Sequence, residues 1–108
     1  MELKGISASG GFGAGPAKIV KNVKDLEKIN RGDVMVVCHS NPAFVAGLFK
    51  VSAVISENGG TLFHLALLAR EAGIPLVSGV KNATTLIKEH TIVTVLATGE
   101  EGEINVNK

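Results

Sequence analysis

The stretch that decides the fold runs from residue 57 to residue 75 and reads Glu57-Asn58-Gly59-Gly60-Thr61-Leu62-Phe63-His64-Leu65-Ala66-Leu67-Leu68-Ala69-Arg70-Glu71-Ala72-Gly73-Ile74-Pro75. A pair of glycines follows an apolar run, and a histidine four residues later opens a short apolar helix. We expect this helix to end at the Gly-Ile-Pro signal, because glycine favours the position after a helix and proline cannot continue one. A histidine at a helix start beside a glycine turn is well placed to carry a phosphoryl group.

Length and composition narrow the classes of protein to which the chain can belong. Its 108 residues predict one domain, spanning 1–108, that buries roughly 65% of its unfolded surface. The formal net charge is +1 and the basic residues are spread along the chain. With four Phe, no Trp and no Tyr, the sequence offers few stacking platforms. These features argue against nucleic-acid binding.

The cysteine content and the N-terminus predict a cytoplasmic protein. The single cysteine, Cys38, excludes a disulfide within the chain and fits a reducing compartment. Cys38 closes an apolar run and is predicted to be a core residue rather than a reactive thiol. The N-terminus lacks the apolar segment of a signal peptide, and no apolar run approaches the ~20 residues that span a bilayer. We therefore expect no membrane partner.

Apolar runs alternate with short helical patterns through the middle of the chain, which predicts an α/β domain with some parallel pairing. The last two strands are predicted to form a hairpin, and the Gly-rich segment 5–15 is either a flexible lead or an ordered loop. We expect strands at 18–20, 34–38, 52–56, 76–78, 91–96 and 103–106, and helices after Asn22, at 43–49, from His64 and after Asn82.

The chemistry at His64 is coherent for a transient phosphohistidine. Neutral imidazole is a nucleophile near neutral pH. The backbone N–H groups and dipole of a helix start favour the anionic phosphoryl group. Gly59 and Gly60 lack Cβ atoms, so their backbone N–H groups can approach a phosphate closely. The alternative is a buried or capping histidine beside a tight glycine turn, and the local sequence favours neither.

Other kinds of site find less support. His39 and His90 do not lie at the i, i+4 spacing of a helical metal pair, and there is no second cysteine, so we expect no metal site. No G-x-S-x-G elbow supports a Ser-His-Asp triad. The glycines of segment 10–15 resemble a dinucleotide loop only weakly, because no strong strand precedes them and Pro16 interrupts the expected helix.

A wider pattern covers nearly the whole chain. It includes Gly13-Ala14-Gly15-Pro16-Ala17-Lys18-Ile19-Val20, Gly32-Asp33-Val34-Met35-Val36-Val37, Ser40-Asn41-Pro42, Ser56-Glu57-Asn58-Gly59-Gly60, Ala69-Arg70-Glu71-Ala72-Gly73-Ile74-Pro75-Leu76-Val77-Ser78-Gly79, Ala83-Thr84, Val93-Thr94-Val95 and Glu101-Gly102-Glu103-Ile104. In these motifs the chain resembles the phosphohistidine, or swivelling, domain of phosphoenolpyruvate-utilising enzymes. That family includes phosphoenolpyruvate synthase, pyruvate phosphate dikinase and enzyme I of the sugar phosphotransferase system.

The resemblance implies a swivelling β/β/α domain with short helices around a mixed, partly parallel sheet. It makes His64 the phosphoryl-carrying histidine, and Gly59 and Gly60 the turn that presents it. In the family this domain moves between a nucleotide-binding domain and a phosphoenolpyruvate/pyruvate barrel. Separately encoded proteins of these two kinds are the partners expected here. The domain itself would bind no cofactor, and Mg²⁺, ATP and phosphoenolpyruvate would be bound by the partners.

The chain departs from the family pattern next to the histidine. The family reads Gly-Gly-x-Thr-Ser-His or Gly-Gly-x-Thr-Cys-His, whereas Leu62 and Phe63 precede His64 here. A hydroxyl and a small residue are thereby replaced by bulky apolar groups, although Thr61 offers a hydroxyl one position earlier. Glu57 replaces the family's Asp. A common Asp-Gly turn reads Glu89-His90, which requires a non-glycine residue in the left-handed region.

Three further side chains are candidates to line the site. Ser40 and Ser56 follow neighbouring strands, whose ends are where α/β sites gather, although ordinary turn bonding explains them equally well. Arg70 lies about 240° around the helix from His64. We expect Arg70 to form an exposed or fold-bracing ion pair, with contact to the phosphate or to a partner domain as the alternative.

Three functions follow from these observations. The first is a stand-alone phosphocarrier that acts through His64 as the phosphotransferase component of a larger system. The second is a binding or regulatory module that keeps the fold without the chemistry, as Leu62 and Phe63 would suggest. The third, an independent hydrolase, has the least support because the sequence shows no base or orienting group near His64.

Overall fold

Seven strands form one sheet that closes into a barrel in the order β1-β5-β4-β3-β2-β6-β7, with β7 paired to β1. The structure is a computed structural model, and it describes residues 1–39, 41–58 and 63–107. The strands are β1 (Glu2–Ser9), β2 (Gly11–Val20), β3 (Val34–Val37), β4 (Ala53–Ser56), β5 (Leu76–Ser78), β6 (Ile92–Thr98) and β7 (Glu101–Val106).

The barrel has a parallel half and an antiparallel half. Strands β2, β3, β4 and β5 pair in parallel, whereas β1, β6 and β7 make antiparallel ladders with their neighbours. The predicted mixed sheet and the terminal hairpin of β6 and β7 are therefore confirmed. Closure of the sheet was not predicted, and it removes the exposed strand edges that an open sheet would leave.

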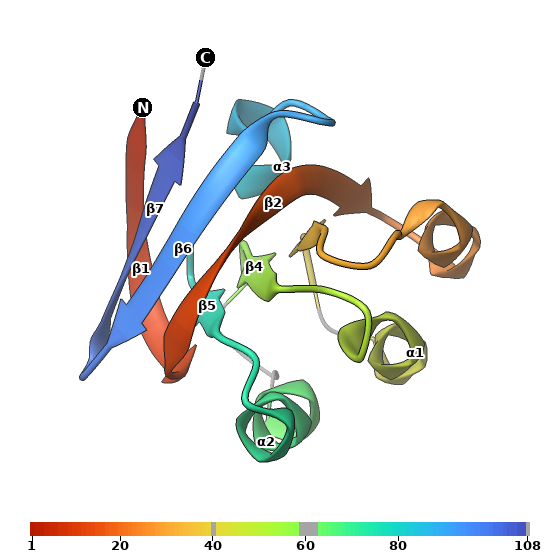
Figure 1. Cartoon of the computed structure of the whole chain (residues 1–108), viewed down its shortest axis with the longest axis horizontal. Coiled ribbons are helices and arrows are strands. Elements are labelled where there is room, and N and C mark those ends of the chain that lie inside the picture. The colour runs from red at the N-terminus through yellow and green to blue at the C-terminus, as the bar shows by residue number, and fades with distance from the viewer. Residues whose placement is uncertain (40, 59–62, 108) are drawn as a thin grey trace.

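Short helices link the parallel strands and lie together outside the sheet (Figure 1). Pro42 stands at the first helical position, as predicted, and the Asn41 side chain accepts a hydrogen bond from the Ala43 amide. The helical elements are the 3₁₀ helices η1 (Val23–Lys28) and η2 (Pro42–Phe44) and the α-helices α1 (Val45–Leu48), α2 (Phe63–Ala72) and α3 (Ala83–Leu86).

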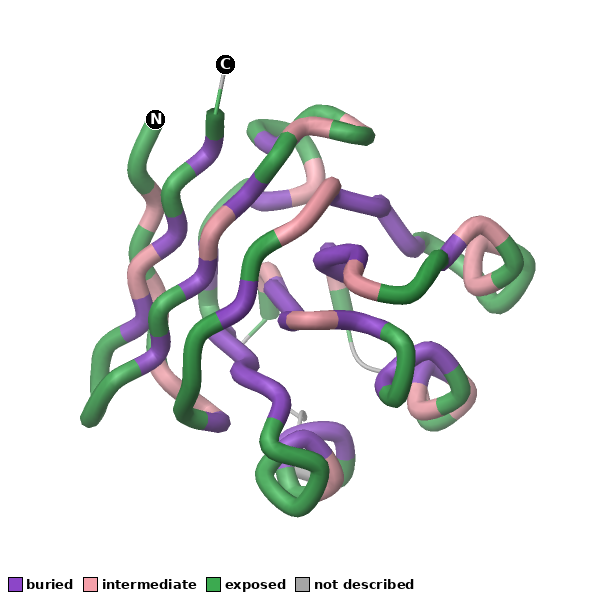
Figure 2. The backbone as a smooth tube through the Cα atoms, viewed as in Figure 1, coloured by how far each residue is buried: buried purple, intermediate pink, exposed green. Residues whose placement is uncertain are grey.

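Two hydrophobic clusters hold these layers together, because alternate residues of each strand point to opposite faces. Inside the barrel lie residues such as Val36, Ile55, Val77, Val95 and Ile104, and α3 closes one end of the barrel by adding Ala83. The second cluster lies between the parallel strands and the outer helices and includes Met35, Val37, Phe44, Leu48, Val54, Leu65, Ala69 and Leu76. Figure 2 shows the alternation of buried and exposed residues along β6 and β7.

The prediction of a glycine-rich lead or loop at 5–15 was wrong, because all of these residues except Gly10 belong to β1 and β2. The glycines are needed where the narrow barrel brings strands close together. A Cβ atom on Gly13 would collide with the Ser52 carbonyl and approach the Ala53 side chain. A Cβ on Gly15 would collide with the Gly32 carbonyl. Close contacts between strands, rather than turn formation, therefore explain Gly13 and Gly15.

Helix boundaries follow the sequence signals with two differences. Helix α2 ends where predicted: Gly73 adopts a positive φ of 74°, and the Ile74 amide bonds back to the Ala69 carbonyl at 2.9 Å. The helix expected after Asn22 is a 3₁₀ helix. Asn82 precedes α3 but makes no capping bond with its side chain; it occupies the left-handed region instead, at a φ of 60°.

A test of the glycine explanation compares Gly13→Ala with Gly10→Ala. The first change forces a methyl group into backbone, so we expect it to lower the free energy of unfolding by about 1–3 kcal/mol. A Cβ on Gly10 would meet only the Ala97 carbonyl, at an ordinary 3.5 Å, so Gly10→Ala should change stability by less than about 0.5 kcal/mol. Urea unfolding measures both. Equal losses would contradict the explanation.

Candidate functional site

The candidate site lies at the edge of the barrel where the parallel strands end. Val20, Val37 and Ser56 end β2, β3 and β4, and they are paired in register. The residues that follow them, among them Cys38 and Glu57, therefore emerge at a common edge. Carboxyl ends of parallel strands are where α/β proteins gather ligand-binding groups.

Helix α2 begins at this edge and presents His64 to solvent. Leu65 and Ala69 are buried in the outer cluster, one helical turn apart, and fix this helix against the sheet. His64 is the second residue of the helix and is exposed. Its position in the first turn matches the prediction, and the alternative of a buried histidine is wrong. The backbone N–H groups of this turn favour an anion.

Several predicted site residues lie outside the part of the chain that the structure describes. These are Gly59, Gly60 and Thr61, predicted to hold the phosphate, together with Leu62 and Ser40. The roles proposed for these residues therefore remain predictions from the sequence.

A hydrogen-bonded junction at Glu57 was not predicted from the sequence. The Glu57 carboxylate accepts hydrogen bonds from the Thr84 amide at 2.7 Å, from the Thr84 hydroxyl, and from the Cys38 thiol at 3.2 Å. The junction thus joins the ends of β3 and β4 to α3. A carboxylate directly after a buried parallel strand is a usable signal for Glu57, whereas nothing local marks Thr84 as its partner.

The junction sets the protonation of both its titratable groups. Hydrogen bonds from Thr84 outweigh burial and hold the pKa of Glu57 below its ordinary value of 4.5. The pKa of the Cys38 thiol is raised, chiefly because it donates to Glu57, and burial adds to the effect. Cys38 is half-buried beyond the end of β3, so its prediction as a core residue was wrong. Its thiol stays protonated near neutral pH and is a poor nucleophile.

Ser56 and Arg70 have structural contacts. Ser56 is fully buried and its hydroxyl donates to the Asn58 carbonyl at 3.0 Å, which is the turn bonding considered as its alternative role. Arg70 braces the fold through the backbone rather than through the expected ion pair: its Nε donates to the Ala8 carbonyl at 2.7 Å. Among the described side chains, no carboxylate lies within ion-pair distance of Arg70.

Comparison with known proteins assigns the chain to a family. Residues 29–99, more than half of the chain, match the family model described as "PEP-utilising enzyme, mobile domain". The chain belongs to this family. It is 38% identical over 93 residues to a probable phosphoenolpyruvate synthase of Methanothermobacter thermautotrophicus, covering 86% of this chain and 14% of the synthase.

Solved structures support the same fold for this mobile domain. A solution structure of enzyme I is 28% identical, with a TM-score of 0.65, over 76% of this chain and 33% of that one. A UPF0107 protein is 18% identical, with a TM-score of 0.75, and the match covers 100% of both chains. At that identity the second likeness concerns the fold alone.

The mobile domain is short beside its relatives. The chain spans 11–14% of the length of the curated relatives that it matches. Across the described ranges, no helix is both long enough and apolar enough to cross a membrane.

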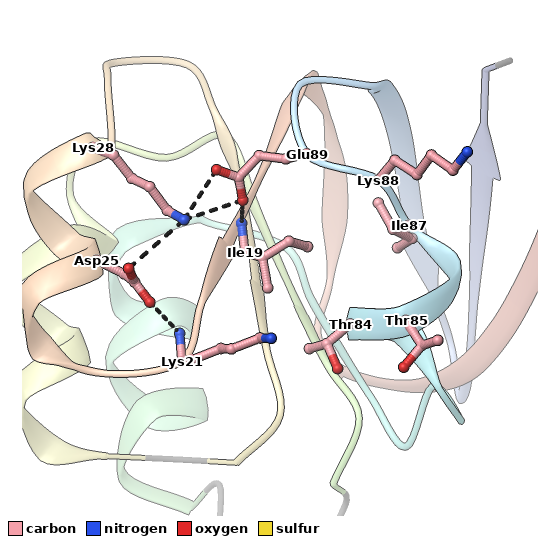
Figure 3. A pocket seen from close by; sticks show the side chains of 9 residues that line it. All are labelled: Ile19, Lys21, Asp25, Lys28, Thr84, Thr85, Ile87, Lys88 and Glu89. Atoms are coloured by element: carbon pink, nitrogen blue, oxygen red, sulfur yellow. Dashed lines mark hydrogen bonds and ion pairs between the residues drawn. The ribbon is translucent and has the colours of Figure 1, made fainter.

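A groove of about 520 Å³ lies between η1 and α3 and is lined in part by Thr84 of the Glu57 junction. Figure 3 shows its lining residues. Its two carboxylates are engaged within the fold. Asp25 accepts from the Lys21 amide at 2.8 Å, and Glu89 accepts from the Ile19 amide at 2.7 Å and from Lys28 at 3.1 Å. The Lys21 amide is the largest influence that holds the pKa of Asp25 below its ordinary value. These bonds brace η1 against the end of β2 and the segment after α3.

The lowered pKa of Glu57 predicts a pH-dependent contribution to the stability of the mobile domain. Because the folded state favours the carboxylate, the contribution is present above the ordinary pKa near 4.5 and is lost as pH falls through the lower folded value. We expect Glu57→Gln to cost about 1 kcal/mol at neutral pH. The difference from wild type should shrink between about pH 5 and pH 3. Urea unfolding at several pH values measures this difference, and a constant difference would contradict the prediction.

Proposed function

We propose that the chain is a phosphoryl carrier that uses His64 as its acceptor nucleophile. The observation that supports this most directly is the exposed His64 in the first turn of α2, at the strand-end edge of a PEP-utilising mobile domain. Burial of the opposite face of α2 holds the helix still, while the imidazole remains accessible to other proteins. A carrier requires both properties.

The proposed chemistry consists of two displacements. In the first, the lone pair of an imidazole nitrogen of His64 forms an N–P bond, and the bond between phosphorus and the donor oxygen breaks with its electron pair going to the leaving group. In the second, an acceptor oxygen forms the new P–O bond and the N–P electron pair returns to the imidazole. The N–H groups at the start of α2 favour the negative phosphoryl group between the two steps.

The donor and acceptor are proposed to be bound by other proteins or domains. The chain matches only a small fraction of each phosphoenolpyruvate synthase, so the rest of each relative has no counterpart in these 108 residues. We infer that separate nucleotide-binding and phosphoenolpyruvate/pyruvate-binding partners supply ATP, Mg²⁺ and phosphoenolpyruvate. The mobile domain would then pass the phosphoryl group between them.

Replacing His64 should abolish phosphate transfer to the chain. The phosphoryl source is the Methanothermobacter synthase with Mg²⁺ and either phosphoenolpyruvate or ATP, labelled in the phosphate that is transferred. We expect acid-labile label on wild type and none on His64→Ala. His90→Ala is the control because His90 is also exposed but belongs to a turn far along the chain. Scintillation counting before and after mild acid treatment gives the result. Label that persists in His64→Ala, or no label on wild type with either donor, would contradict the proposal.

A second function is favoured by one specific observation. Leu62 and Phe63 stand where the family pattern has a hydroxyl residue and a small residue, directly before the histidine. A domain with these residues would keep the fold and bind partners without accepting phosphate. Partner binding that is unaffected by His64→Ala would support this regulatory function.

Restoring the family residues separates the two functions. If the site has lost its chemistry, Leu62→Thr with Phe63→Ser should raise the rate of His64 phosphorylation about tenfold or more, since a hydrogen bond to a charged group contributes about 1.5–3 kcal/mol. If the wild-type site is competent, the gain should stay below about threefold, or under 1 kcal/mol. Initial rates of labelling measure the effect, and Leu67→Thr, on the exposed face of the same helix, is the control.

A further inference from the structure

The groove between η1 and α3 opens where β2 ends, and its walls come from distant parts of the chain. Lys21 follows β2 directly, whereas Thr84 and Thr85 belong to α3. The buried side chains of Ile19 and Ile87 also line the groove. An apolar lining with a few polar groups at its rim is the common form of a binding site.

Bonds within the fold hold both walls of the groove in place. On the η1 side, the buried Lys18 amine donates to the Lys28 carbonyl at 3.3 Å and to the Asp33 carboxylate at 2.8 Å. The Asp33 carboxylate also accepts from the Asn30 amide at 2.7 Å. On the other side, α3 is fixed by Ala83, which is packed in the barrel core. A groove that is formed before binding spares a ligand part of the cost of ordering it.

The charge that this groove presents to solvent is positive. The carboxylates of Asp25 and Glu89 both accept hydrogen bonds from backbone amides, and both lie within ion-pair distance of Lys28. Lys21 and Lys88 are exposed, and neither forms an ion pair with another residue that the structure describes. The acidic groups of the lining are therefore used by the fold, and two lysines remain for a ligand.

From these features we propose that the groove is a docking site for an acidic segment of a partner protein. Lys21 and Lys88 pair with carboxylates of that segment, and the exposed Thr85 offers a hydroxyl donor between them in the sequence. The proposal goes beyond the carrier function, because this contact requires no phosphate on His64.

The arrangement of the lysines favours an acidic segment over a single small anion. Figure 3 shows Lys21 extending into the groove from the η1 side, whereas Lys88 extends away from it on the α3 side. Separated cations suit several carboxylates spaced along a chain, while one phosphate group is best held by donors that converge on it. Among the described residues that line the groove none is aromatic, so a nucleotide base would have no ring on which to stack.

The test is a titration of the ¹⁵N-labelled chain with a capped hexaglutamate peptide, followed by two-dimensional NMR at neutral pH. We expect the amide signals of Lys21, Thr85 and Lys88 to shift and to saturate. Binding should weaken when the ionic strength is raised from about 0.02 M to about 0.3 M, because salt screens exposed charges. A capped hexaglutamine peptide should leave these signals unchanged.

Charge variants connect this binding to the two lysines. Lys21→Gln combined with Lys88→Gln should raise the Kd about fivefold or more, which corresponds to about 1 kcal/mol. Lys21→Arg combined with Lys88→Arg keeps the charge and should bind within about twofold of wild type, or about 0.4 kcal/mol.

The matched control removes two lysines elsewhere. Lys4→Gln combined with Lys50→Gln makes the same change in net charge, and neither residue lines the groove. Lys4 belongs to β1, and the Lys50 carbonyl accepts from the Gly32 amide at the opposite end of the parallel strands. Both side chains are exposed. This variant should keep the wild-type Kd, as should His64→Ala.

Four results would overturn the proposal. The first is the absence of saturable shifts at the groove in wild type, and the second is an equal loss of affinity in the Lys4 and Lys50 control. The third is a similar loss in His64→Ala, which would place the binding at the histidine. The fourth is tighter binding of pyrophosphate than of the hexaglutamate peptide at the same amides, which would indicate a site for small anions.

Discussion

Parallel pairing of β2, β3 and β4 in register is the constraint on which the candidate site at the strand-end edge of the barrel depends. It brings the ends of these strands to one place, so that Cys38 and Glu57 meet although 19 positions separate them in the chain. It also delivers the chain to the start of α2, where His64 stands. Strands β1, β6 and β7 close the barrel and support the parallel strands from the opposite side. Helix α3 closes the end of the barrel at which Glu57 accepts hydrogen bonds from Thr84.

A phosphoryl carrier must combine a rigid frame with an exposed nucleophile, and α2 shows how one helix can do both. Leu65 and Ala69 bury one face of the helix against the parallel strands, while His64 stays in solvent at its first turn. Arg70 was expected to form an ion pair. It instead ties the helix to β1 through a hydrogen bond to the Ala8 carbonyl. The helix is thereby held on two sides, and its exposed face carries the histidine.

The sequence predicted most of the elements of the parallel half, because continuous β-branched runs and helix signals such as Pro42 and Gly73 are local. It failed where structure is set by distant contacts. Glycine carries no strand propensity, and only the close approach of Ser52 and Gly32 explains Gly13 and Gly15 in β2. Likewise, the bonds from Thr84 to Glu57 join residues 27 positions apart, so the sequence alone pointed to His64 but not to this junction.

The most direct test of the carrier proposal uses the wild-type chain and its three histidines, His39, His64 and His90, all of which are exposed. The chain is treated with phosphoramidate, and site-specific phosphorylation is followed over time by tandem mass spectrometry at alkaline pH, where phosphohistidine survives. If the edge of the barrel is built for phosphate, His64 should react about tenfold faster than the other two, a preference of about 1.4 kcal/mol. Equal rates at the three positions, or faster reaction at His39 or His90, would contradict the proposal.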